Sequence, residues 1–498
     1  MKLVKNLSGL VAIILVVSFF SGCFSTDVGP TASEKTKSDS TASIGTESLD
    51  DVFREMSDDQ FKYGEGNLTE LKKSNAAFRE ALRLNPENNE ARLGAAITSV
   101  LLAMQSKRLS ELVNETADAG SPLDFGSTLD AGAKRTALLR SLHGEDRPEI
   151  HELQDAVADT LLPVLETAIN QLQAVYNDAA FSLTLTIDGK EKEIDRGEVS
   201  VLLAGFKTLH AISTLVLAYD LDFDDNGSYA YLDVIDDIGD IDDFSELTTA
   251  QSNALTTLTN LLKMSSPFLA VRPAWKSKLA NVDNEINSAL DVLHAGLKSI
   301  STETDDQDND ILRLCSNTSA IHSDCINRNA YNDGLDAIDS VRKYMNQPYP
   351  VAIADTTVKV NFAAYFNVQD YKKMWPYYGF YTPATSWSED KPVFYFANSS
   401  GAITGNVKTL SDLLDRADEN NWTNKKLVDS LKLVIKWRDP TFQGFLPGST
   451  EASLWNLILK LANEGEGPLG KVATSTGKRR FASSLLRPTF ALSLLGKN

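Results

Sequence analysis

The first 23 residues place the strongest constraint on what this chain can become. A short basic start precedes an apolar run from Leu10 to Phe20, which is too short to cross a bilayer as a stable helix. Gly22, a small residue, and then Cys23 follow directly. A basic segment, an apolar core and a small-residue cleavage site are typical of a secretory signal, so we expect the remaining chain to fold after export.

Cys23 makes this signal more specific. The residues Phe20-Ser21-Gly22-Cys23 resemble the lipobox of bacterial lipoproteins, in which a signal peptidase cuts before the cysteine and its sulfur receives diacylglycerol. Phe20 stands where that pattern usually has Leu. The resemblance implies that residues 1–22 are a lipoprotein signal peptide and that lipid on Cys23 anchors the chain to a membrane. The alternative is an ordinary secretion signal with an incidental cysteine.

The residues after Cys23 predict a sorting signal and a flexible spacer. Phe24 follows the cysteine, and the absence of Asp there resembles the signal that sorts lipoproteins to the bacterial outer membrane, on its periplasmic or its surface face. Residues 23–48 are rich in Ser, Thr, Gly and Lys, and their few apolar side chains cannot offset the entropy of ordering. They predict a flexible tether that begins with the lipidated cysteine.

Length and charge limit the classes of protein that fit. At 498 residues the chain exceeds what one hydrophobic core supports, which predicts two or more domains. The net charge of -20 argues against a nucleic-acid partner, because an acidic surface repels phosphate groups.

A helical pattern begins at about residue 49, and part of it resembles a tetratricopeptide repeat. Phe78 and Ala81 share one face of a helix that Pro86 ends, and Ser74 stands at the small position before Phe78. Small residues allow the next helix to pack closely, and these are Ala91, Ala95 and Ala96. The resemblance covers about one and a half repeats, fewer than the roughly three that a free-standing solenoid needs.

The helix that precedes this stretch fits the repeat only with a shifted register, through Phe61, Tyr63 and Gly64. Two interpretations stay open. The resemblance implies a groove that binds a protein or peptide, and the alternative is a helical hairpin that caps an all-helical domain.

The middle of the chain combines helices with one hairpin. An amphipathic run from Glu149 to Tyr176 predicts a helix that Pro163 kinks. Alternating residues from 182 to 194 around Asp188-Gly189 predict a β-hairpin. Val199 to Tyr219 is very apolar but is interrupted by polar residues, so we expect a buried central helix in preference to a membrane span.

The acidic stretch after this helix contains a candidate calcium site. Residues 222–233 match an EF-hand-like loop, with a glycine at its sixth position, and alternating oxygen ligands on a tight turn suit a hard cation. The expected ligands are Asp222, Asp224, Asn226, Ser228 and Asp233. The last ligand is Asp where Glu is usual, which should weaken binding. The alternative is an acidic surface loop without an ion.

Cys315 and Cys325 are the cysteines that remain if Cys23 is lipidated. In an oxidising compartment this closely spaced pair predicts a disulfide, and two buried free thiols are the alternative. Metal binding by the pair is not expected, because the ligand spacing is wrong and no second pair exists.

Composition shifts near Pro348, where we expect a domain boundary. Strands are predicted at 357–366 and 393–396, and helices at 410–418, 426–437 and 450–462. Aromatic residues crowd residues 351–396; Trp375 and Trp387 among them would line a sugar site only if a cleft with two carboxylates lay beside them. Histidine, serine and glycine motifs of enzymes are missing or wrongly spaced, so no catalytic residue is nominated.

Together these features predict a mainly α protein, in which a tetratricopeptide-like helical body with one β-hairpin precedes a smaller α+β domain. The expected ranges are 1–22 for the signal peptide, 23–48 for the tether, 49–347 for the helical domain, 348–464 for the α+β domain and 465–498 for a basic tail. The leading function is a non-catalytic binding or scaffolding role in the cell envelope. The alternatives are a calcium-stabilised module that captures a surface ligand, and a surface carbohydrate-active enzyme.

Overall fold

The computed structural model describes residues 30–56, 68–106, 109, 154–187, 190–221, 266–303, 310–315, 326–353, 356–374, 376–378 and 422–464. The chain divides into two units, which are described separately. Met1–Leu217 and Asn281–Arg342 form the first, and Ala218–Ala280 and Lys343–Asn498 form the second. With the predicted ranges 49–347 and 348–464, the chain would pass from one domain to the next once. In the structure, the chain passes between the two units three times.

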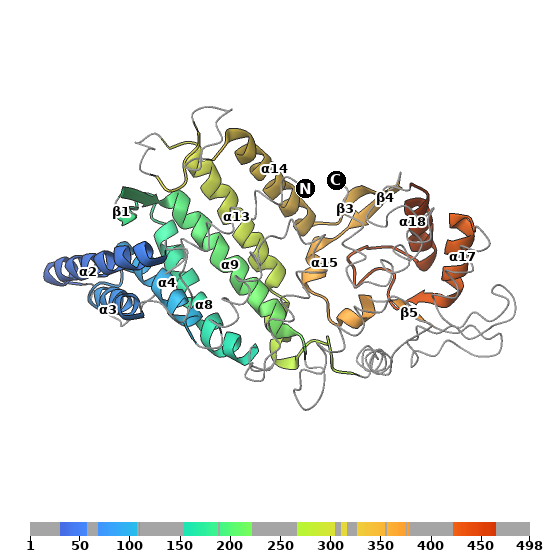
Figure 1. Cartoon of the computed structure of the whole chain (residues 1–498), viewed down its shortest axis with the longest axis horizontal. Coiled ribbons are helices and arrows are strands. Elements are labelled where there is room, and N and C mark those ends of the chain that lie inside the picture. The colour runs from blue at the N-terminus through green and yellow to red at the C-terminus, as the bar shows by residue number, and fades with distance from the viewer. Residues whose placement is uncertain are drawn as a thin grey trace. The chain divides into compact units, whose positions relative to one another are not determined.

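The described residues are mostly helical, as the sequence predicts (Figure 1). The elements up to the hairpin are α2 (Ala32–Met56), α3 (Leu68–Leu84), α4 (Asn89–Met104), a π-helical turn η2 (Val157–Leu161), α8 (Leu162–Tyr176), β1 (Ser182–Ile187) and β2 (Lys190–Asp195). The long helices that follow are α9 (Arg196–Ala218), α13 (Val282–Ile300) and α14 (Arg328–Asn346).

Helix α2 occupies most of the predicted tether, and this is a correction. Thr31 and Glu34 begin the helix with a capping box, because the Thr31 amide donates to Glu34 Oε2 at 2.8 Å and the Glu34 amide donates to Thr31 Oγ1 at 3.2 Å. A stripe of inward-facing residues then follows at helical spacing: Ser38, Ala42, Gly45, Leu49 and Val52. The first three are small or polar, so a search for large apolar residues misses the stripe.

Helices α2, α3 and α4 pack closely around one aromatic ring. Phe78 on α3 is 1% exposed, and its ring fills the space beside Gly45 of α2 and Gly94 of α4. A Cβ atom at position 45 would lie 2.8 Å from the ring, and one at position 94 would overlap it. The helix that precedes α3 in the described residues and packs against it is therefore α2. Phe61, Tyr63 and Gly64, through which the sequence predicts the preceding helix, lie outside the described residues.

Predictions for the middle of the chain are largely confirmed. The sequence predicts a kink at Pro163, and there the helix is locally irregular: the π-helical turn η2 ends directly before α8, which carries this proline in its first turn. Strands β1 and β2 pair antiparallel from Ser182–Asp195 to Ile187–Lys190, on either side of Asp188-Gly189. Within the part of the chain that the structure describes, α9 is the one helix long and apolar enough to cross a membrane, and 56% of its apolar window is buried inside the protein.

The second unit combines short strand pairs with helices. Its elements are η3 (Pro273–Trp275), α12 (Lys276–Leu279), β3 (Tyr349–Ile353), β4 (Thr356–Val360), α15 (Phe362–Phe366), η4 (Tyr371–Met374), β5 (Pro376–Tyr378), α17 (Asn424–Val434), β6 (Ile435–Trp437) and α18 (Glu451–Glu464). Strand β3 pairs with β4, and β5 pairs with β6, both antiparallel. The largest fully buried side chains of its core are Trp455, Phe442, Phe445 and Lys372.

Two predicted elements of the second unit end differently. The strand predicted over 357–366 stops at Val360, and the last residues form α15, whose Asn361 amide donates to the Phe445 carbonyl at 2.8 Å. The helix predicted over 426–437 gives way to β6 at Ile435, because the backbone there pairs with β5. Pairing partners distant in sequence decided both ends.

Candidate functional site

Several predicted site residues lie outside the described residues. These are Cys23, the complete calcium loop with Asp222, Asp224, Asn226, Ser228 and Asp233, the cysteine Cys325, and the tryptophans Trp375 and Trp387. Lipidation, calcium binding and the sugar platform therefore stay predictions. Within the described ranges, no group of three or more His, Cys, Asp or Glu side chains is arranged to hold a metal ion.

Cys315 is described, and its surroundings bear on the predicted disulfide. Its side chain is buried at 3% exposure, and its amide donates to the Ile326 carbonyl at 2.9 Å. The Ile326 amide in turn donates to the Arg313 carbonyl at 2.7 Å. The backbone therefore holds Cys315 beside Ile326, the residue that follows Cys325 in the sequence. Cys325 lies outside the described residues, so the disulfide stays a prediction.

The first helices form the region for which the sequence predicts either a groove or a cap. Every residue of α4 from Leu93 to Val100 is buried, because the helix packs against α2, α3 and α8. Polar groups also face inward here. The side-chain amide Nδ2 of Asn75 donates to Thr98 Oγ1 at 2.5 Å and to Ser99 Oγ at 3.1 Å. The stretch of α4 from Leu93 to Val100 is therefore an interface between helices and is not itself exposed to a partner. The groove and the capping hairpin both stay predictions.

A second polar cluster joins α8, α9 and α13 around His210. The imidazole Nδ1 lies 2.6 Å from Glu285 Oε1 of α13, and Nε2 lies 3.5 Å from Glu166 Oε1 of α8. One turn away on α9, Lys207 Nζ donates to Ser288 Oγ at 2.8 Å and to Gln173 Oε1 at 3.2 Å. One charged face of α9 thus contacts polar groups on two neighbouring helices.

The electrostatics of this cluster follow from burial and from its carboxylates. The His210 side chain is 13% exposed, and burial works to lower its pKa, but hydrogen bonding to Glu285 and the charges of Glu285 and Glu166 outweigh burial and raise it. Burial lowers the pKa of Lys207, against the opposing charge of Glu285. Protonated imidazole is thus favoured between the two glutamates.

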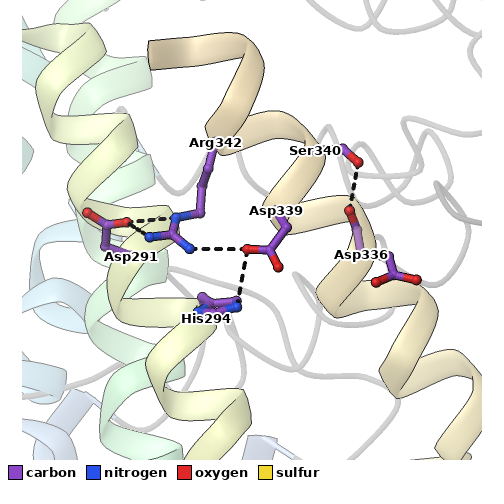
Figure 2. A network of polar contacts seen from close by, with 6 residues as sticks. All are labelled: Asp291, His294, Asp336, Asp339, Ser340 and Arg342. Carbon is purple, nitrogen blue, oxygen red and sulfur yellow. Dashed lines mark hydrogen bonds and ion pairs between the residues drawn. The ribbon is translucent and has the colours of Figure 1, made fainter.

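A third network joins α13 to α14 (Figure 2). Arg342 Nη2 lies 2.5 Å from Asp291 Oδ1, and Arg342 Nη1 lies 3.1 Å from Asp339 Oδ1. The same Asp339 oxygen lies 3.2 Å from His294 Nε2. Figure 2 shows Arg342 and His294 both reaching the same carboxylate oxygen of Asp339. Both aspartates are about 60% exposed, so water competes for these pairs and the network holds the helices weakly.

Sequence reasoning treated His210 as an interruption of an apolar helix and found neither network. A usable signal was present, because Lys207 and His210 are three residues apart on one helix, as are Glu285 and Ser288 on another. The sequence did not show that these two faces meet, since α9 and α13 are separated by residues 219–281.

Comparison with known proteins adds no relative: the chain matches no protein-family model, no curated protein sequence and no solved structure.

Proposed function

We propose that this chain is a lipid-anchored protein of the bacterial outer membrane, whose helical body has a non-catalytic binding or scaffolding role in the cell envelope. The observation that carries the proposal is the apolar run that ends in Gly22-Cys23. The secretory signal also agrees with the buried Cys315, whose neighbour by backbone pairing follows Cys325.

The polar clusters support scaffolding. His210 and His294, the histidines that the structure describes, contact carboxylates on neighbouring helices. The buried contacts of His210 hold α8, α9 and α13 against one another, and rigid helices present a stable surface to a partner. We infer that α2, α3 and α4 form a tetratricopeptide-like cap, and that the partner is a protein or peptide. The outer face of α2, where Ile44 is 48% exposed, is the surface to probe.

The anchor is tested by metabolic labelling with a fatty acid, followed by membrane fractionation and mass spectrometry of the mature N-terminus. The wild-type chain should carry the label on Cys23 and fractionate with the outer membrane. Cys23→Ser should lose the label, whereas the matched control Cys315→Ser should keep it. An unmodified mature N-terminus would contradict the proposal.

The binding role is tested by cross-linking intact envelopes and identifying the adducts. Ile44→Glu should remove an adduct that the wild-type chain forms, while circular dichroism stays unchanged. Val341→Glu is the matched control, because Val341 is an apolar residue of α14 with similar exposure, 41%. Equal adducts in all three chains would count against α2 as the binding surface.

A further inference from the structure

We propose that His210 is a proton-operated clamp, which holds one end of α13 against α9 and α8 when the imidazole is charged and releases it when the imidazole is neutral. The inference concerns the fold of the first unit and does not depend on the proposed envelope function.

The clamp sits at one end of an antiparallel seam between α9 and α13. Gly197 and Ser200 near the start of α9 meet Ile300 and Gly296 near the end of α13. A Cβ at position 296 would overlap Ser200 Oγ, so the two backbones are as close as glycine allows. This end of the seam is closely packed, and it has carboxyl groups of its own. A Cβ at position 197 would lie 3.1 Å from Asp195 Oδ1 and 3.3 Å from Glu303 Oε1, and burial raises the pKa of Glu198. Any pH response here is separate from that of His210, and the His210 variants distinguish the two.

The other end of the seam is polar. There, His210 of α9 contacts Glu285 of α13 at 2.6 Å, and Lys207 donates to Ser288 at 2.8 Å. Glu166 of α8 lies 3.5 Å from the second ring nitrogen. The charged groups that face His210 are therefore Glu285 and Glu166, and Lys207 lies on its own helix. Two carboxylates and one cation surround the imidazole, so a charged ring balances the cluster.

This geometry fits a proton switch better than a metal site or a catalytic dyad. The two carboxylates contact opposite nitrogens of the ring, so their oxygens and the imidazole cannot converge on one ion. Each ring nitrogen lies within ion-pair distance of a glutamate, at 2.6 Å for Nδ1 and 3.5 Å for Nε2, and no serine, threonine or cysteine nucleophile is among these contacts. An imidazolium presents a proton to each glutamate, whereas a neutral imidazole presents one proton and one lone pair. Deprotonation therefore sets a lone pair against one carboxylate.

The direction of the pH effect follows from the raised pKa of His210. The unfolded chain has a histidine pKa near its ordinary value of 6.5, and the folded value is higher. The stabilising effect of the clamp is therefore complete below about pH 6.5 and is lost as the pH rises through the folded pKa. The clamp would act over the range in which histidine is the usual sensor, about pH 5 to 8 and somewhat above.

The test is hydrogen exchange of the full mature chain, corrected for the intrinsic pH dependence, at pH 5.5 and pH 8.5. Protection should be lost at pH 8.5 in the first half of α13, around Glu285. His210→Gln should remove this difference between the two pH values, because glutamine holds no titratable proton. The matched control His294→Gln should keep it, since His294 is equally buried, 13% exposed, but contacts one carboxylate.

A second variant covers the case in which His210→Gln does not fold. Glu166→Gln changes a half-exposed side chain, removes one charge beside the ring and should lower the pH at which protection is lost. An NMR titration of the His210 ring in the wild-type chain measures the same transition directly. Protection that is independent of pH in the wild-type chain, or an unchanged pH dependence in His210→Gln, overturns the proposal.

Discussion

Lys372 is the most unusual residue of the second unit, because a lysine is rarely fully buried. It is 0% exposed, and its Nζ donates to the carbonyls of Ser266 at 2.5 Å and Phe268 at 2.6 Å. Asp370 Oδ1 lies 3.7 Å away. Burial lowers the pKa of Lys372, and the charge and hydrogen bond of Asp370 act against this. The ammonium group therefore joins two backbone segments that are about 100 residues apart.

Replacing Lys372 with Met should destabilise the second unit by about 3–5 kcal/mol, because two buried carbonyls and a carboxylate lose their partner. Lys373→Met is the matched control, since Lys373 is exposed, and it should change stability by less than about 0.5 kcal/mol. All six tryptophans lie in the second unit, so intrinsic fluorescence during urea unfolding reports this unit alone. Equal midpoints for the two variants would refute the role of Lys372.

Single residues were predictable from sequence only where their partners are local. Ser74, Phe78 and Ala81 were identified through helical spacing, and all three are buried as expected. Lys372 and His210 were not identified, because their partners lie far away in the chain and a lone charged residue in a sequence resembles a solvated one.

Among the secondary-structure elements, α2 shows why a polar composition does not exclude a packed helix. Ser38 is fully buried because its hydroxyl donates to the Ala81 carbonyl of α3 at 2.8 Å and accepts from Asn88 Nδ2 at 3.0 Å. The Ser74 hydroxyl of α3 likewise donates to the Gly45 carbonyl at 2.7 Å. Small hydroxyl residues thus satisfy their hydrogen bonds with backbone carbonyls and a side-chain amide across a close interface.

The packing of α2 predicts a sharp contrast between neighbouring residues. Ala42→Asp places an unpaired charge in the interface with α3, where Ala42 is 0% exposed, and should cost about 2–4 kcal/mol. Ser43→Asp lies on the exposed face of the same helix and should change stability by less than about 0.5 kcal/mol. Helical circular dichroism during urea unfolding measures both. If both substitutions are harmless, α2 does not pack as described.

Elements with a strong local signal were predicted well. The hairpin around Asp188-Gly189 follows from turn chemistry and is present. The missing amide of proline predicts a kink at Pro163, and a π-helical turn lies directly before α8 there. Helix α15 and strand β6 were missed because their conformation depends on Phe445 and on β5, which are distant in sequence.

At the scale of the whole molecule, hydrogen bonds join the residues on either side of the acidic stretch 222–265. The Asp220 amide donates to the Ala270 carbonyl at 3.0 Å, and the Leu269 amide donates to the Asp220 carbonyl at 2.7 Å. The described residues on either side of 222–265 are therefore held together, next to the segment that Lys372 holds. An ion bound within this stretch would therefore stabilise the second unit.

If residues 222–233 bind calcium, chelation should lower the melting temperature of the second unit, monitored by tryptophan fluorescence. An ion at 100 times its dissociation constant stabilises by about 2.7 kcal/mol. Asp224→Ala should remove the response to chelator, whereas Asp243→Ala, an acidic residue of the same stretch outside the loop, should keep it. If chelation leaves the melting temperature of the wild-type chain unchanged, residues 222–233 are an acidic surface loop without a bound ion.

The early start of α2 has a consequence for reach. Eight residues, 24 to 31, separate Cys23 from Ala32, and a fully extended chain spans about 3.3–3.6 Å per residue. With lipid on Cys23, the leash would be shorter than roughly 30 Å, comparable to the hydrocarbon thickness of one bilayer. The helical body would then stay within a thin layer at the membrane surface, and a partner could bind it only within that layer.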